Sequence, residues 1–244
     1  IADGHNTLVV APTGSGKTLA AFLWAIDDLA QHPSATSGRS RPGTRVLYVS
    51  PLKALAVDVE RNLRTPLTGL ARVAERAEMP APSITVGVRS GDTTAKDRRD
   101  LISRPPDILI TTPESLFLML TSAARDTLAD VRTVIIDEVH AVAATKRGAH
   151  LAVSLERLDA LLPRPAQRIG LSATVRPAEE VARFLAGSAP TTIVAPPADK
   201  TFELQVQVPV PDMTNLTEGS IWPDVEERIV DLVEAHRSCI VFAN

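Results

Sequence analysis

Short apolar runs alternate with helical patterns along most of the chain. The runs predicted as strands cover residues 7–10, 45–50, 83–88, 107–111, 131–136 and 168–171. Between them, apolar residues recur three or four positions apart, which is typical of helices packed on a sheet. One predicted helix buries Leu116, Leu118 and Leu120, and another places Leu151, Leu155, Leu158 and Leu162 on one face. This alternation indicates βαβ units, so we predict an α/β fold with a mostly parallel sheet and sites at the carboxyl ends of its strands.

The pattern changes after residue 195. Strict alternation over residues 202–208 predicts one strand within an extended connector that is rich in Pro and Thr. We predict a helix over residues 224–236, capped by Asp224, and then an apolar strand over residues 238–243. One helix and one strand cannot form a core, so they are interpreted as the opening of a second α/β domain. The predicted division is a first domain at 1–195, a connector at 196–223 and the start of a second domain at 224–244.

Composition narrows the class of protein without defining its function. Hydrophobic residues make up 44% of the 244 residues, which allows a folded core, and aromatic residues make up only 3%, so that core must be aliphatic. No run of about 18 apolar residues is present, which argues against a membrane span. The single cysteine, Cys239, cannot form an internal disulfide, which favours a cytoplasmic location. The segment 32–43 is rich in Ser, Pro, Gly and Arg and is predicted to be a surface loop.

A glycine-rich turn follows the first strand and opens a helix. Its sequence is Ala-Pro-Thr-Gly-Ser-Gly-Lys-Thr over residues 11–18, and Ala11 stands where the general phosphate-loop pattern has its first Gly. Gly14 and Gly16 let successive backbone N–H groups face an anion at the start of the helix. Lys17 can then reach the outer phosphates of a nucleotide, and the Thr18 hydroxyl can ligate Mg²⁺. We therefore predict nucleotide contacts from Thr13, Gly14, Ser15, Gly16, Lys17 and Thr18.

Two acids close the apolar run at 131–136. In a chain that already has a phosphate loop, Asp137 is suited to hold magnesium, and Glu138 to orient and deprotonate an attacking water. His140 leaves two interpretations open: a hydrogen-bonded residue near the surface, or a link between the nucleotide site and Ser172 with Thr174. No other His or Cys stands at ligand spacing from it, so zinc is not indicated.

Five segments, taken in order and at their intervals, resemble motifs I, Ia, Ib, II and III of superfamily 2 helicases. They are residues 11–18, residues 51–55, Thr112-Pro113-Glu114-Ser115, residues 137–140 and residues 172–174. The longer strings around them are most similar to the large helicase-related proteins of bacteria and archaea. The box at residues 137–140 is Asp-Glu-Val-His and not Asp-Glu-Ala-Asp, which argues against a DEAD-box RNA helicase. The excess of Arg over Lys points to a GC-rich, actinobacterial type of genome.

The resemblance covers residues 1 to about 195 and implies a RecA-like motor domain that binds ATP and Mg²⁺. It assigns hydrolysis to Lys17, Asp137 and Glu138, and coupling of hydrolysis to movement to His140, Ser172 and Thr174. It places a face that grips the backbone of single-stranded DNA at Pro51, Lys53, Arg89, Ser90, Gly91, Thr112 and Glu114. Two plainer readings stay open: Lys53 and Arg89 as solvated surface charges, and Thr112 as a helix cap.

The function expected from this resemblance is that of a DNA-dependent ATPase. It would move 3′ to 5′ on single-stranded DNA and unwind DNA or RNA–DNA hybrids in DNA repair. The glutamine motif that reads adenine, the second motor domain with its arginine fingers and the C-terminal domains are expected elsewhere in the protein, so this piece should hydrolyse ATP poorly. The alternatives are an RNA helicase, a non-motor ATP-binding module and, less favoured, a P-loop kinase.

Overall fold

The computed structural model describes residues 1–32, 43–197, 203–210 and 219–242. The chain forms two compact units, Ile1–Ala198 and Asp199–Asn244, and each is described by itself. The predicted surface loop falls almost entirely on residues 33–42, outside the described residues.

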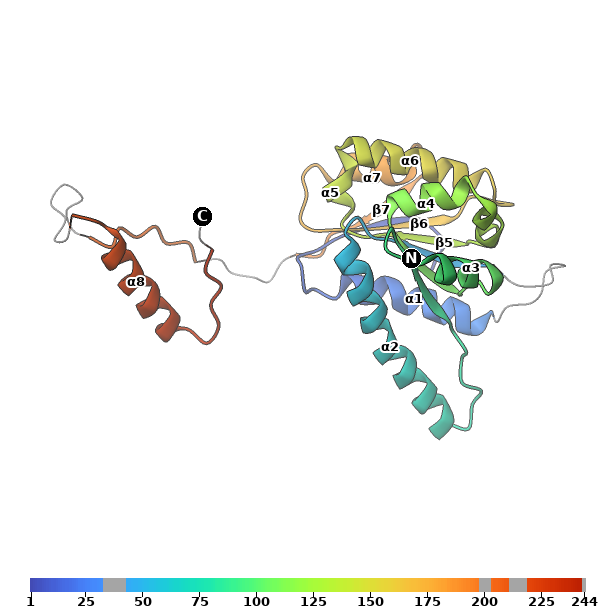
Figure 1. Ribbon diagram of the computed structural model, residues 1–244, viewed down its shortest axis with the longest axis horizontal. Helices are drawn as coiled ribbons and strands as arrows, with labels where there is room; N and C mark the ends of the chain where they lie inside the picture. The colour runs from blue at the N-terminus through green and yellow to red at the C-terminus, as the bar shows by residue number, and fades with distance from the viewer. Residues whose placement is uncertain (33–42, 198–202, 211–218, 243–244) are drawn as a thin grey trace. The chain divides into compact units, whose positions relative to one another are not determined.

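The first unit is built on one sheet of seven strands, all of them parallel (Figure 1). The order across the sheet is β3-β4-β2-β5-β6-β1-β7. The strands are β1 (Asn6–Val10), β2 (Val46–Val49), β3 (Val86–Arg89), β4 (Ile108–Thr111), β5 (Thr133–Ile136), β6 (Gln167–Ser172) and β7 (Thr191–Val194). The predicted α/β fold and parallel sheet are confirmed, and β7 is an edge strand that the sequence pattern did not reveal.

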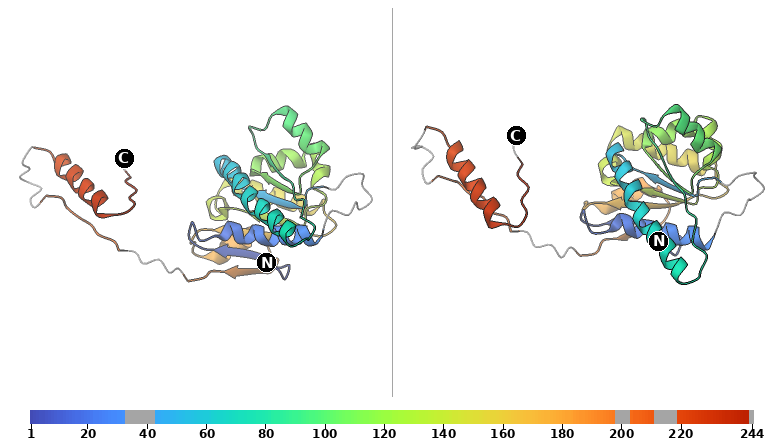
Figure 2. Two further views of the ribbon diagram at one scale, coloured as in Figure 1. Left: turned by 90° about the horizontal axis from the view of Figure 1, so that it is seen from below. Right: turned by 60° about the horizontal axis from the view of Figure 1, so that its bottom comes forward.

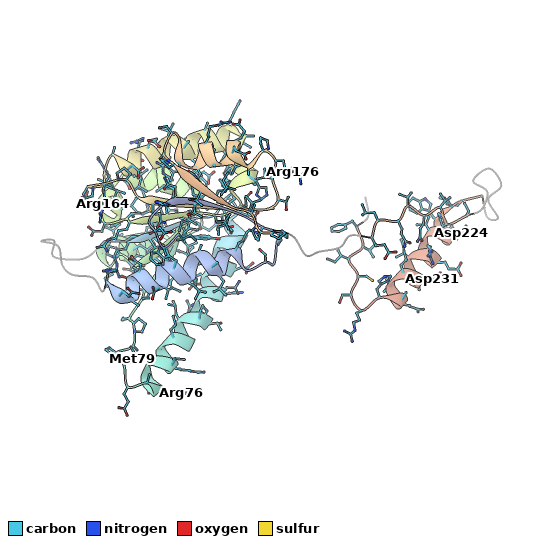
Figure 3. The ribbon with its side chains drawn as sticks, turned by 180° about the vertical axis from the view of Figure 1, so that it is seen from behind. Arg76, Met79, Arg164, Arg176, Asp224 and Asp231 are labelled. Carbon is cyan, nitrogen blue, oxygen red and sulfur yellow. The ribbon has the colours of Figure 1, made fainter. Side chains whose placement is uncertain are left out.

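Helices cover both faces of this sheet, so the unit has three layers (Figures 1 and 2). One face carries α1 and α2, and the other carries α4 to α7. The helices are α1 (Lys17–Gln31), α2 (Lys53–Arg76), α3 (Ala95–Ser103), α4 (Pro113–Leu120), α5 (Val139–Ala143), α6 (Lys146–Asp159) and α7 (Ala178–Ala186), with a 3₁₀ turn η1 (Ala123–Leu128) after α4. The far end of α2, with Arg76, projects away from the sheet together with Met79 (Figure 3).

The central strands are buried along their whole length because helices cover both of their faces. In β2, Val46 and Tyr48 pack with α1, whereas Leu47 and Val49 pack with the opposite helical layer. This alternation follows from the period of two along a strand. The core lies in two aliphatic layers above and below the sheet, and it fixes the strand ends on which a site can be built.

Two details of the predicted helices are wrong. Leu118 is 54% exposed, since residues two apart on a helix point to nearly opposite sides and Leu116 already faces the core. Leu162 is buried as predicted but follows the end of α6 at Asp159. Among the described residues, no helix has the length and apolar character needed to span a membrane.

The second unit contains α8 (Trp222–Ala235), which begins before the predicted start. Asp224 lies in the first turn and Ile221 takes the cap position, so the predicted capping role of Asp224 is wrong. The strands expected at 202–208 and 238–243 are not formed at residues 203–208 and 238–242. A strand requires hydrogen bonds from a neighbouring strand, and the described part of this unit supplies none, so Val206 and Phe242 are exposed.

Candidate nucleotide site and nucleic-acid interface

The sheet topology sorts the predicted site residues into two groups along one edge. All seven strands are parallel, so their carboxyl ends meet at that edge. The neighbouring strands β5, β6 and β1 end at the acids, at Ser172 and at the glycine-rich turn. The strands β3, β4 and β2 end at Arg89, at Thr111 and just before Pro51. The predicted nucleotide residues therefore lie on one half of the edge and the predicted nucleic-acid residues on the other.

The turn after β1 has the backbone that a phosphate loop requires. Gly14 and Gly16 have φ angles of +82° and +85°, in the left-handed region that favours glycine. A Cβ at either position would meet nothing within 4 Å. Glycine is therefore favoured at both positions by the backbone angle and not by a lack of space. The Ser15 N–H donates to the Pro12 carbonyl at 3.2 Å and closes the turn.

The first turn of α1 is open to an anion. Gly16 is its N-cap, no side chain caps it, and its first turn contains no acidic residue. The unpaired N–H groups and the positive end of the helix dipole therefore stay available. Residues 13–16 are exposed, which leaves the turn accessible to a ligand.

Lys17 and Glu138 bring the turn and the acids into one site. The Lys17 side chain is buried, and its Nζ lies 3.8 Å from Glu138 Oε1. Glu138 itself has φ 43° and ψ 42°, a left-handed backbone that is uncommon for a residue with a side chain. Such an outlier is typical of functional sites, where surrounding contacts hold a strained residue.

Asp137 is buried, and each of its two carboxylate oxygens accepts one hydrogen bond. Its Oδ1 accepts the Glu138 N–H at 2.9 Å, and its Oδ2 accepts the Tyr48 hydroxyl. Burial, and next the charge of Asp137, raise the pKa of Tyr48, so the phenol stays a donor. Tyr48 stacks on Phe22 with 5.0 Å between ring centroids. Sequence reasoning missed Tyr48, although a chain with one tyrosine that places it inside an apolar strand gives a usable signal.

His140 connects the end of β5 to the end of β6. Its Nδ1 accepts the Ala173 N–H at 3.2 Å and lies 3.2 Å from Ser172 Oγ, while its Nε2 lies 3.4 Å from Glu138 Oε2. Because Nδ1 accepts a backbone N–H, the ring proton belongs on Nε2, which faces the carboxylate. The geometry therefore favours the linking interpretation of His140. Thr174 does not join this group: it is exposed, and its side chain makes no hydrogen bond to the described residues.

Magnesium ligation can be tested against the donors that are present. The Thr18 hydroxyl is partly buried and makes no hydrogen bond to any described residue. Among those residues there is no group of three His, Cys, Asp or Glu side chains that could hold a metal ion. One hydroxyl and one carboxylate, from Thr18 and Asp137, fit a Mg²⁺ ion that keeps waters and takes its other ligands from nucleotide phosphates.

On the other half of the edge, Arg147 joins two of the predicted nucleic-acid segments. Its guanidinium forms an ion pair with Glu114, with Nη2 2.9 Å from Oε2, and also donates to the Pro51 carbonyl. The hydrogen bond from Arg147 is the main cause that lowers the pKa of Glu114 to about 2. Sequence reasoning missed Arg147, because it lies on α6 and 33 positions from Glu114.

The other residues predicted to contact nucleic acid differ in burial and in their hydrogen-bond partners. Lys53 is exposed and pairs with Asp92 at 2.9 Å, beside Gly91. The Ser90 N–H donates to Thr93 Oγ1 at 2.8 Å. Thr112 is buried and caps α4 by accepting the Ser115 N–H, so the helix-cap reading is correct for its side chain. Arg89 is only 8% exposed, so the reading as a solvated surface charge is wrong for it.

A parallel sheet whose first strand ends in a phosphate loop, one strand away from a strand that ends in two acids, defines the class of P-loop NTPases with a RecA-like fold. Residues 1–183 match the family model described as DEAD/DEAH box helicase, and the chain belongs to this family. The DEAD-box helicase Mss116 bound to ssRNA and UDP-BeF shares the fold, with a TM-score of 0.63 at 17% identity over 79% of this chain and 37% of that one.

The resemblance to large helicase-related proteins is confirmed. The chain is 79% identical over its whole length to "Lhr helicase/probable uracil glycosylase" of Mycolicibacterium smegmatis and 54% identical to "Lhr helicase/uracil glycosylase" of Escherichia coli. It spans 16% and 17% of the length of these two relatives. A solved structure of Mycobacterium smegmatis helicase Lhr, bound to ssDNA and AMP-PNP, has a TM-score of 0.84 at 78% identity, covering 99% of this chain and 30% of that one.

Proposed function

We propose that this chain is the ATP-binding motor domain of a DNA-dependent ATPase and helicase that moves along single-stranded DNA. The observation that carries the proposal is the 3.8 Å approach of Lys17 Nζ to Glu138 Oε1. It unites the phosphate loop and the acidic pair, which lie far apart in the sequence, in one site. The ssDNA and AMP-PNP bound to the Mycobacterium smegmatis protein support the choice of nucleic acid and nucleotide.

The residues divide the chemistry among themselves. Lys17 and the first N–H groups of α1 neutralise the outer phosphates of ATP. Mg²⁺, held by Thr18 and Asp137, would supply charge stabilisation at those phosphates. Glu138 orients a water and accepts its proton, and the Nε2 proton of His140 faces the other carboxylate oxygen.

Coupling follows from the same contacts. A movement of the Glu138 side chain would displace His140, because the two side chains are in contact. His140 in turn contacts both Ser172 and the Ala173 backbone at the end of β6. These contacts would relay the nucleotide state to neighbouring parts of the motor. Thr174 is exposed, so it would take part in coupling only through contact with another domain of the motor.

The same proposal extends to the direction of movement, the duplexes unwound, the cellular location and the domain organisation. The motor would move 3′ to 5′, unwind DNA or RNA–DNA duplexes in DNA repair, and act in the cytoplasm. The domain assignment belongs to it as well: a motor domain at 1–195, a connector at 196–223 and the start of a second motor domain at 224–244. Arginine fingers of a second domain contribute about 10³–10⁵ in rate in P-loop enzymes, so this chain by itself should turn over slowly.

Nucleotide binding and hydrolysis test the proposal separately. Binding of a fluorescent ATP analogue with Mg²⁺ should be lost in Lys17→Ala and kept in Glu138→Gln, whereas hydrolysis should be lost in both. Lys96→Ala is the matched control, because Lys96 is exposed on α3. Unchanged affinity in Lys17→Ala, or unchanged turnover in Glu138→Gln, would contradict the proposal. Stimulation of turnover by matched DNA and RNA strands then distinguishes the two nucleic acids.

A further inference from the structure

A cavity of about 840 Å³ lies at the edge of the sheet opposite the nucleotide site. Arg45, Arg132 and Gln167 line it, and they stand at or just before the first residues of β2, β5 and β6. In Figure 3, Arg164 of the cavity lies at one end of the first unit, and Arg176, which follows the end of β6, lies at the other. No described residue that lines the cavity has a role at the nucleotide site or at the predicted nucleic-acid interface.

The cavity and the nucleotide site are separated by the length of the strands. The phosphate loop and the two acids follow the carboxyl ends of β1 and β5, which have five and four residues. At about 3.3 Å per residue, these strands place the two edges roughly 13–17 Å apart. A ligand in the cavity would therefore not touch the phosphate loop.

Three arginines among the described lining residues give the cavity positive charge. Arg132 and Arg164 are exposed, and their side chains make no hydrogen bond or ion pair with any described residue. Arg45 is 6% exposed, pairs through Nη2 with Asp107 at 2.9 Å and donates through Nη1 to the His32 carbonyl. Its buried Nε has no hydrogen-bond partner within the described part of the chain. Most of these guanidinium N–H groups therefore remain available for an anion.

Two acids also belong to the described wall of the cavity, and both already have contacts. Oδ1 of Asp28 lies 3.2 Å from Nδ1 of His32, and Oδ2 of Asp130 accepts the Gly43 N–H at 2.7 Å. Three guanidinium groups and two carboxylates leave an excess of one positive charge on this wall. The charge of the wall therefore favours an anionic ligand.

The rest of the cavity includes a flat aromatic side chain. Trp24 is half-buried on α1, where it packs against the core layer that contains this helix. Other apolar parts of the wall come from Ala129, Val131, Pro163 and Pro165. An aromatic ring offers a stacking surface to a flat ring of a ligand. The volume lies within the range of about 300–1,000 Å³ that is typical of small-molecule sites.

We propose that this cavity binds a nucleoside monophosphate, with its phosphate on Arg132 and Arg164 and its base against Trp24. A phosphate monoester carries a charge of about −1.5 to −2 at neutral pH and offers three oxygens to forked guanidinium donors. A purine or pyrimidine base supplies the flat ring. The proposal does not depend on the proposed function, because its residues lie at the other edge of the sheet from the phosphate loop.

Trp24 provides the signal that tests the site. The chain has two tryptophans, so Trp222→Phe leaves Trp24 as the only indole. AMP added to this variant without Mg²⁺ should quench the fluorescence, and Lys17→Ala should leave the affinity for AMP unchanged. Adenosine, which lacks the phosphate, should bind at least about 10-fold more weakly, as expected for lost hydrogen bonds between charged groups. Equilibrium dialysis with radiolabelled AMP measures the same affinities without fluorescence.

Replacing the arginines tests the phosphate contacts. Arg132→Met and Arg164→Met should each weaken AMP binding about 10-fold to 100-fold. Both side chains are exposed, so the melting temperature of each variant should stay near the wild-type value. Arg125→Met is the matched control, because Arg125 is exposed on η1 and does not line the cavity. It should leave AMP binding unchanged.

Four results would overturn the proposal. The first is the absence of AMP binding in dialysis, and the second is unchanged affinity in both Arg132→Met and Arg164→Met. The third is loss of AMP binding in Lys17→Ala, which would assign the signal to the phosphate loop. The fourth is equal binding of adenosine and AMP, which would remove the phosphate from the site. Loss of ATP binding or hydrolysis at the other edge would count against the proposed function and leave this proposal standing.

Discussion

Replacing Tyr48 with Phe removes one hydroxyl from the wall of the nucleotide site and leaves the ring in place. The Tyr48 side chain is completely buried, and its hydroxyl donates to Oδ2 of Asp137, which is 5% exposed. Stacking of the ring on Phe22 does not depend on the hydroxyl. The substitution therefore isolates one hydrogen bond to a buried carboxylate.

The magnitude follows from the charge of the acceptor. A buried hydrogen bond to a charged group contributes about 1.5–3 kcal/mol, and this one is buried because Tyr48 is 0% exposed. The free energy of unfolding of the first unit should fall by this amount. For a domain of this size the change corresponds to about 2–4 °C in melting temperature per kcal/mol.

Urea unfolding followed by circular dichroism measures the effect, with Asp137→Asn as the second arm of a double-mutant cycle. The two substitutions should couple by about 1 kcal/mol or more, because they remove the same contact. If Tyr48→Phe left the free energy of unfolding unchanged, or if the two effects simply added, the Tyr48 hydroxyl would not hold Asp137.

Three further outcomes are expected. Arg147→Gln should raise the pKa of Glu114 from about 2 toward 4.5, as followed by NMR titration of its carboxyl group. Since the folded pKa lies below the unfolded one, the pair stabilises the fold above about pH 4.5 and loses its effect as the pH falls toward 2. Gly16→Ala should cost about 1–2 kcal/mol in urea unfolding, because φ is +85° and no clash contributes. Arg168→Met should cost about 3–5 kcal/mol in the same assay, because it leaves the carboxylate of Asp159 without its buried partner.

Controls for these variants lie nearby in the fold. Lys146→Gln should leave the pKa of Glu114 unchanged, since Arg147 is the group that contacts it. Arg183→Met breaks an exposed pair with Glu180 and should cost less than about 1 kcal/mol. The reasoning on Glu114 would be contradicted if its pKa stayed near 2 in Arg147→Gln. The reasoning on Gly16 would be contradicted if Gly16→Ala kept the wild-type free energy of unfolding. The reasoning on Arg168 would be contradicted if Arg168→Met and Arg183→Met lowered the free energy of unfolding equally.

The sequence predicted the parts of the site that depend on local chemistry. The glycines at 14 and 16 are recognisable because their backbone needs left-handed angles, and the acids because they end an apolar run. Their meeting was also predictable, since the carboxyl ends of parallel strands share one edge. Tyr48 and Arg147 were not predictable in this way, because each acts through a contact with a segment far away in the chain.

Failures of the strand predictions have a related cause. The edge strand β7 has four residues with alternating partial burial, a pattern too short to stand out. The alternation at 203–208 is clearer, yet no strand forms there, because pattern alone supplies no neighbour. Burial of Arg89 is equally invisible in the sequence, where an arginine is expected to be solvated.

The edge strand also has a mechanical consequence. β7 pairs in parallel with β1 from Asn6↔Thr191 to Val9↔Val194, and the chain leaves β7 toward residue 195. Tension along the strand direction at that exit loads this ladder in shear, so its hydrogen bonds share the force instead of opening one by one. The hydrogen bonds pass the force from β7 to β1, and the residues that follow β1 form the glycine turn. Tension on the chain after β7 is therefore transmitted to the phosphate loop through the single strand β1.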